Sequence, residues 1–126
     1  YNVTYLNNQS YNNGGNGILI DVGGVGSSGV VSLSGNVITG NTNIGLRISD
    51  ASPDTLVVDA GGGSLGSTGR NSIYGNTNVE VRVDLDGAEL KAENNYWGSA
   101  TGLAGGEVTL DGGTTIDADP FLSEAP

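Results

Sequence analysis

The sequence predicts an all-β solenoid, in which short coils of chain stack on one another. A near-repeat is the first observation: residues 71–83, NSIYGNTNVEVRV, are identical to residues 36–48, NVITGNTNIGLRI, at more than half of their positions. Apolar residues alternate within each copy, as at Ile44, Leu46 and Ile48, which is the period of a strand buried on one face. The third observation is 23 glycines among 126 residues, with one Phe and one Trp, which supplies bends but few large core side chains.

Four copies of the repeat align on a leading asparagine. The anchors are Asn8, Asn36, Asn71 and Asn95, which lie 28, 35 and 24 residues apart. A period that varies this much excludes a coiled coil, whose seam needs fixed heptads. Each copy is predicted to form a strand, an Asn/Gly bend, a second strand and a loop of variable length, which is one coil of a solenoid.

The same alignment predicts part of the core. Ile38, Ile73 and Trp97 occupy one position of their copies, so we expect them to stack inside the coils. The length favours a single domain over residues 1–126.

Two phrases of the sequence resemble a known family. One is GNVITGN at residues 35–41, which returns as RNSIYGN at 70–76, and the other is the ending, ENNYWG at 93–98 followed by IDADPFL at 116–122. They resemble right-handed parallel β-helix proteins of the pectate-lyase-like superfold, in particular β-helix regions of bacterial surface proteins and adhesins. The resemblance implies a single-stranded right-handed parallel β-helix of about four to five coils, a hand that parallel crossover connections also prefer.

The resemblance also implies a role for the anchor asparagines. In such folds, equivalent asparagines stack as a ladder at one bend, where each amide bonds backbone groups that the turn leaves unpaired. We therefore expect a structural ladder of four residues: Asn8, Asn36, Asn71 and Asn95.

A glycine-rich motif imitates a dinucleotide-binding fingerprint. Residues 24–29, GVGSSG, follow the strand-like run 18–22 and match G-x-G-x-x-G, with Asp50 at about the distance of a ribose-binding acid. The fingerprint requires a helix whose N-terminus faces the pyrophosphate, whereas residues 30–33 read as another strand. We interpret the motif as a loop between strands, and the glycine run 61–64 as an insertion that lengthens the 35-residue spacing.

Composition argues against an enzyme. The sequence has no His and no Cys, which removes histidine acid–base chemistry, His-activated nucleophiles and the usual zinc sites. The family includes lyases that act on acidic polysaccharides, but a net charge of −10 would repel a polyuronate. Asp84 and Asp86 are close enough to be paired carboxylates, yet residues two apart on a strand share a face simply because strands alternate. We expect no catalytic residues.

Two aspartate pairs are candidate calcium ligands. Asp84 with Asp86, and Asp117 with Asp119, place carboxylates at alternate positions beside a bend, and calcium accepts such oxygens in loose geometry. Neither pair has the spacing of a complete binding loop, and loop aspartates in Asx turns explain both pairs better. We expect no cofactor, with calcium as the alternative.

Arg47 and Arg82 occupy the same position of successive copies. Stacked strands lie about 4.8 Å apart, so the two guanidinium groups would be neighbours that need an anionic partner. We expect that partner to be Glu80, Asp84 or another acid of the chain. The alternative is a carboxylate or sulfate from a glycan or a neighbouring subunit, held in a small cationic notch.

Other partners follow from charge and short motifs. The acidic composition argues against nucleic acid, which needs a basic stripe, and no apolar run is long enough for a membrane span. Motifs for N-glycosylation begin at Asn2 and Asn8, and Asn2 is the better candidate because Asn8 is assigned to the ladder. Acidity, repeats and the lack of cysteine are typical of a bacterial extracellular or cell-surface protein.

These observations favour a non-catalytic structural module of a surface or fibre protein. The alternatives are a carbohydrate- or host-binding adhesin module and a polysaccharide lyase or hydrolase. Residues 107–126 are expected to close the C-terminal end, whereas residues 1–6 alternate as an uncovered strand, with Val3 and Tyr5 in the positions of Val31 and Leu33. Because an open edge exposes unpaired N–H and C=O groups, we expect flanking coils of a longer chain, or a second copy stacked head to tail into a filament, to cover it.

Overall fold

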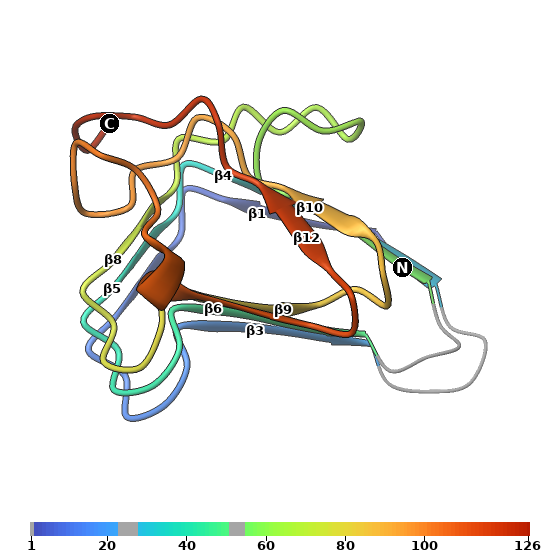
Figure 1. Cartoon of the computed structure of the whole chain (residues 1–126), viewed down its shortest axis with the longest axis horizontal. Helices are drawn as coiled ribbons and strands as arrows, with labels where there is room; N and C mark the ends of the chain where they lie inside the picture. The colour runs from blue at the N-terminus through green and yellow to red at the C-terminus, as the bar shows by residue number, and fades with distance from the viewer. Residues whose placement is uncertain (1, 23–27, 51–54) are drawn as a thin grey trace.

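A computed structural model describes residues 2–22, 28–50 and 55–126 of the chain and shows stacked parallel coils that form a β-solenoid of about four turns (Figure 1). The predicted all-β solenoid is therefore confirmed. One short 3₁₀ turn, η1, spans Gly105–Glu107. The strands of the described residues are β1 (Asn2–Leu6), β2 (Gln9–Tyr11), β3 (Ile18–Val22), β4 (Ser28–Ser34), β5 (Val37–Thr39), β6 (Leu46–Asp50), β7 (Thr55–Asp59), β8 (Ser72–Tyr74), β9 (Val81–Asp84), β10 (Glu89–Lys91), β11 (Val108–Asp111) and β12 (Thr115–Asp117).

Each of the first three turns contributes one strand to each of three parallel sheets, which gives the triangular outline in Figure 1. The first sheet has the order β1-β4-β7-β10-β12, the second β2-β5-β8, and the third β11-β9-β6-β3. A coil thus contains three strands, where the sequence predicted two. The additional strands, β1, β4 and β7, precede the near-repeat. Alternation predicts β1 and β4, at residues 1–6 and 30–33, as strands, whereas β7 lies in a segment for which the sequence predicts only a loop.

The strands keep their register although the spacing between coils varies. Ile38 lies opposite Ile73 in the second sheet, and Val3 and Tyr5 lie opposite Val31 and Leu33 in the first. Additional residues between coils are therefore accommodated at the bends, while the paired strands remain aligned. This is the arrangement expected of a solenoid in which each coil contacts only its neighbours.

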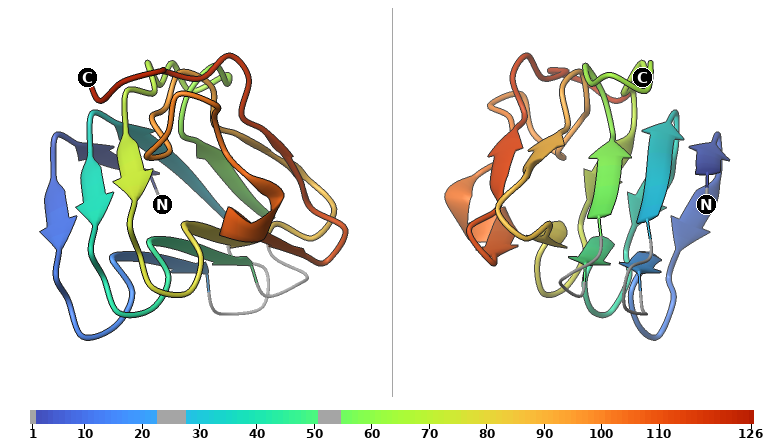
Figure 2. Two further views of the ribbon diagram at one scale, coloured as in Figure 1. Left: turned by 60° about the vertical axis from the view of Figure 1, so that its left-hand side comes forward. Right: turned by 90° about the vertical axis from the view of Figure 1, so that its right-hand side faces the viewer.

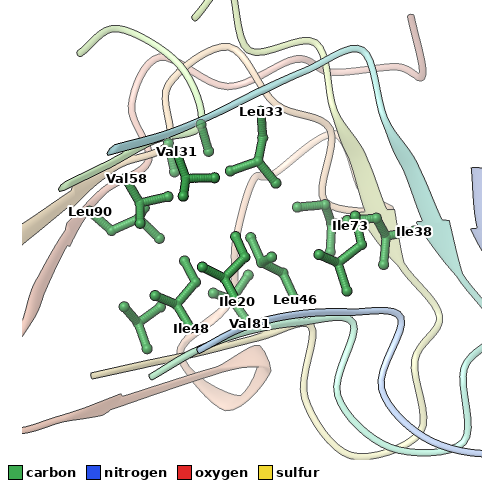
Figure 3. Close-up of a cluster of buried hydrophobic side chains, with 14 of the residues drawn as sticks. Ile20, Val31, Leu33, Ile38, Leu46, Ile48, Val58, Ile73, Val81 and Leu90 are labelled. Atoms are coloured by element: carbon green, nitrogen blue, oxygen red, sulfur yellow. The ribbon is translucent and has the colours of Figure 1, made fainter. Parts of the chain in front are cut away.

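The core is a column of small branched side chains enclosed by the three sheets (Figure 3). Alternate residues of each strand point inward, so Val31 and Leu33 are both only 1% exposed. Ile38 and Ile73 are buried in the second sheet, and Trp97 is buried in the next turn, where the Ile73 amide bonds the carbonyl of the residue before the tryptophan at 2.9 Å. The three residues stack inside the coils.

Residues with positive φ form the bends. The residue before each anchor asparagine is left-handed, and only one of the four is glycine: Asn7, Gly35, Arg70 and Asn94 have φ of 54°, 68°, 61° and 60°. Glycine at position 35 suits this bend, because its φ is positive and a Cβ there would displace the side chain of Asn7 in the preceding coil.

The C-terminal residues continue the stacking beyond the last full coil. The Asn94 amide donates to the Pro120 carbonyl, and the Leu122 amide donates to the Asn95 carbonyl at 2.8 Å. These bonds repeat those of earlier turns, such as the bond from the Tyr96 amide to the Asn71 carbonyl, also at 2.8 Å. Phe121 therefore stands where the next anchor asparagine would stand.

Candidate functional site

The four anchor asparagines form a hydrogen-bonded ladder at the corner between the first and second sheets. In each rung, the backbone N and Nδ2 of one asparagine both donate to Oδ1 of the asparagine in the next coil. The distances are 2.9 and 3.1 Å from Asn8 to Asn36, 3.0 and 2.8 Å from Asn36 to Asn71, and 2.9 and 2.9 Å from Asn71 to Asn95. Asn36, Asn71 and Asn95 are at most 1% exposed and belong to the interior, whereas Asn8 is exposed at the end of the ladder.

The second Nδ2 hydrogen of the ladder residues ties the corner to the first sheet. Asn36 donates to the Tyr5 carbonyl at 2.9 Å, and Asn95 donates to the carbonyls of Ala60 and Ala92 at 2.9 and 2.7 Å. Buried carbonyls that leave the strands at the bend are thereby satisfied, which avoids the cost of an unpaired polar group.

A second ladder, which the sequence analysis did not identify, lies at the corner between the second and third sheets. Asn13 donates its N and Nδ2 to Oδ1 of Asn41 at 3.1 and 2.8 Å, and Asn41 donates to Asn76 at 3.0 and 2.8 Å. The signal was present in the alignment, because these three asparagines occupy one position of the repeat. The ladder has no fourth asparagine; the backbone N and Nδ2 of Asn76 donate instead to the carboxylate of Glu80.

Glu80 is a buried acid with a structural task. Its side chain is 6% exposed and ends the second ladder. Burial raises the pKa of Glu80 above its usual value, an effect that the Asn76 hydrogen bonds oppose and that the charge of nearby Glu107 reinforces. Its place in the fold is the end of the second ladder.

Asp59 organises the loop that follows β7. The carboxylate is 1% exposed and accepts four backbone N–H groups, from Gly61 and Gly63 at 2.9 and 3.0 Å and from Leu65 and Ser67 at 3.0 and 3.2 Å. The glycine run therefore forms an ordered loop around one buried anion. Nothing in the repeat pattern indicated this, because the loop occurs once.

Arg47 and Arg82 lie directly opposite each other in β6 and β9. Arg82 donates Nε to Oδ2 of Asp111 at 2.8 Å, so its partner comes from β11 in the next turn and is neither Glu80 nor Asp84. Among the described residues, Arg47 has no ion pair within 4.0 Å. The two arginines line a notch of about 200 Å³ on the outer face of the third sheet, together with Ser49, Asp84 and Asp111.

The aspartate pairs proposed for calcium form local turns. Oδ1 of Asp84 accepts the Asp86 amide at 3.2 Å, and Oδ1 of Asp117 accepts the Asp119 amide at 3.4 Å. Lys91 donates to Asp117 at 2.7 Å, and this contact lowers the pKa of the Asp117 carboxyl and raises the pKa of the lysine. Within residues 2–22, 28–50 and 55–126, no group of three or more metal-ligating His, Cys, Asp or Glu side chains is found.

Two surfaces have the shape or the side chains of a binding site, and they lie on different sheets. A groove of about 480 Å³ on the first sheet is lined by hydroxyl and apolar groups, including Thr4, Ser32 and Leu65. On the second sheet, Tyr11 is 56% exposed, and the rings of Tyr74 and Tyr96 meet edge to face with centroids 5.6 Å apart. The groove has no aromatic residue in its lining, so the two features do not combine into one site.

The remaining sequence candidates are placed as follows. Asn2 is exposed on β1, and Asn8 uses its Nδ2 in the ladder. Residues 24–27 of the dinucleotide-like motif lie outside the described residues, and the segment after them is strand β4, not a helix. Asp50 is 6% exposed and accepts the Leu56 amide at 3.1 Å. Across the described part of the chain, no helix has the length and apolar character to cross a membrane.

Comparison of the chain with family models, curated proteins and solved structures finds no match.

Proposed function

We propose that this chain is a non-catalytic structural module of an extracellular surface or fibre protein. The observation that carries the proposal is the use of the repeat's defining polar residues. Asn36, Asn41, Asn71 and Asn95 are completely or almost completely buried and bond only to other parts of the solenoid. A sequence that repeats its polar groups in order to join coils is suited to building a stiff spacer, since each coil supports its neighbours.

The surface chemistry supports the same proposal. The net charge of −10 keeps such a module soluble and repels acidic polysaccharides. The chain has no cysteine, so its stability outside a cell would depend on stacking and not on disulfides. We propose that its partners are further coils of a solenoid, either of the same polypeptide or of a neighbouring copy.

The location and size of the native polypeptide test this proposal. An antiserum against the chain should label intact cells of the producing organism, and peptides from residues 1–126 should be released when intact cells are treated with protease. Mass spectrometry of the native polypeptide then shows whether additional repeats accompany these residues. Detection of the polypeptide only in the cytosolic fraction would refute the proposal.

A carbohydrate- or host-binding adhesin is the second candidate, and the second sheet provides the observation that favours it. Tyr11 and Tyr74 both lie in register with Thr39 on the outer face, and exposed aromatic rings are the groups on which sugar rings pack. A glycan array distinguishes the candidates, because an adhesin would retain specific glycans and would lose them after Tyr74→Ala. Arg47→Ala is the matched control on another sheet, and it also reports on the alternative anion-binding notch.

A further inference from the structure

The two ladders have a direction, and this makes the two ends of the solenoid chemically different. In every rung that joins two asparagines, the donor belongs to one coil and the Oδ1 acceptor to the next coil toward the C-terminus. Toward the C-terminal end, both ladders finish inside the molecule. The first ladder stops where Phe121 replaces an asparagine, and the second stops at the Glu80 carboxylate.

At the other end, the same geometry leaves two acceptors to which no described residue donates. β1, β2 and β3 are the edge strands of the three sheets and lie together at one end of the stack (Figure 2). Asn8 and Asn13 are exposed and direct their N and Nδ2 donors into the solenoid, toward Asn36 and Asn41. Among the described residues, no group donates to Oδ1 of Asn8 or Asn13.

We infer that the edge formed by β1, β2 and β3 is a docking surface for one particular partner, a β-solenoid coil with asparagine at both ladder positions. Such a coil would repeat the interface that already joins the coils within this chain, supplying one backbone N and one Nδ2 to each free Oδ1. It would also cover Val3 and Tyr5, which are the half-buried members of the core at this end. The inference rests on the proposed structural function and identifies the partner that this function requires.

A second copy of this chain is a poorer partner than such a coil. Its C-terminal end would present Phe121 at the first ladder position, which lacks an amide side chain, and no asparagine at the second. Two copies that each carry a net charge of −10 also repel one another. The requirement for asparagine at both ladder positions therefore favours flanking coils over head-to-tail filaments.

The test is to supply the coil. A second copy of residues 28–55 is placed directly before Tyr1, so that the grafted counterparts of Asn36 and Asn41 lie one coil before Asn8 and Asn13. The matched control carries Asn36→Ala and Asn41→Ala only in the grafted copy, where these side chains have no role except to bond the edge. Urea unfolding and residue-resolved hydrogen exchange are measured for the original chain, the extended chain and the control.

We expect the extended chain to have a higher urea midpoint than the original, and the control to lose a measurable part of that increase, because it lacks the two Nδ2 donors and keeps the backbone donors. Amide exchange at the two grafted asparagines should be about tenfold slower or more than in an unfolded segment, since each amide gains a hydrogen bond. A grafted coil that exchanges freely on a folded chain would overturn the inference, as would equal midpoints for extended chain and control. Filaments formed by the original chain and abolished by the graft would overturn it too, in favour of a second copy. None of these results depends on where the native protein is located, so the proposed function is tested separately.

Discussion

Replacing Asn71 with alanine should destabilise the fold by about 1–3 kcal/mol, the cost of leaving one buried backbone amide unpaired. Oδ1 of Asn71 accepts both the backbone N and Nδ2 of Asn36, at 3.0 and 2.8 Å. Without that oxygen, Nδ2 of Asn36 still donates to the Tyr5 carbonyl at 2.9 Å. The backbone N–H of Asn36 is left without a hydrogen-bond partner, in a residue whose exposed fraction is 0%.

The carbonyls that accept from Asn71 also have other donors, which limits the loss of stability. Its Nδ2 donates to the carbonyls of Leu33 and Ala60, and each of these carbonyls has another donor, the Ser67 hydroxyl for Leu33 and Nδ2 of Asn95 for Ala60. The magnitude is therefore set by the single orphaned amide of Asn36, not by the sum of all bonds that the substitution removes.

Urea unfolding followed by the fluorescence of Trp97 measures this change, because the only tryptophan is buried beside the ladder corner. Asn8→Ala is the matched control at the exposed end of the same ladder. It removes one Nδ2 donor while the backbone amide of residue 8 still bonds Asn36, so we expect a loss of about 0.5–1 kcal/mol. Equal losses for the two variants, or an unchanged midpoint for Asn71→Ala, would refute the ladder as the source of stability.

Three further outcomes follow from the structure. Asp59→Ala removes the acceptor of four loop amides and should cost about 3 kcal/mol or more, with new protease cleavage within residues 61–67 as the second readout. Because burial raises the pKa of Glu80, the folded state binds the proton of this carboxyl group more tightly than the unfolded state does. The stability that this proton contributes is fully present below the usual glutamate pKa of 4.5, and it is lost as the pH rises through the raised pKa. Glu80→Gln should abolish the decrease in stability that ionisation of Glu80 causes as the pH rises, and urea unfolding between pH 4 and about pH 8 would detect this. Incubation with neutral and acidic polysaccharides, with and without calcium, should release no reducing ends or unsaturated products, whereas turnover that is lost on replacing one aspartate would establish an enzyme.

The solenoid could be predicted from sequence because the corner residues repeat. The bend and the two strands around it recur almost unchanged between residues 36–48 and 71–83, and the alternation of apolar residues fixes which face is buried. The third strand of each coil does not repeat by identity: alternation alone predicts β1 and β4, and β7 is not predicted. NVTYL, SGVVSLS and TLVVD, the sequences of β1, β4 and β7, share only the alternation of buried residues, so they do not align by identity.

The details of the site depended on contacts that occur once. Asp59 holds a loop present in a single coil, and Asp111 reaches Arg82 from a turn whose sequence is too rich in glycine to align. The second ladder was visible in the positions of its asparagines, but its last rung is Glu80, a residue from the same coil as Asn76. A search for one conserved residue type per position therefore could not predict where that ladder ends.

Residue-resolved hydrogen exchange of the backbone amides tests the central claim most directly, namely that the two ladders hold the coils together. The amides of Asn36, Asn41 and Asn71 each donate to a buried asparagine oxygen. They should exchange only through global unfolding and be among the slowest in the chain, with Asn8 and Asn13 faster because their coil frays. Exchange of the three buried amides as fast as that of the exposed Gly105 and Gly106 would contradict the account.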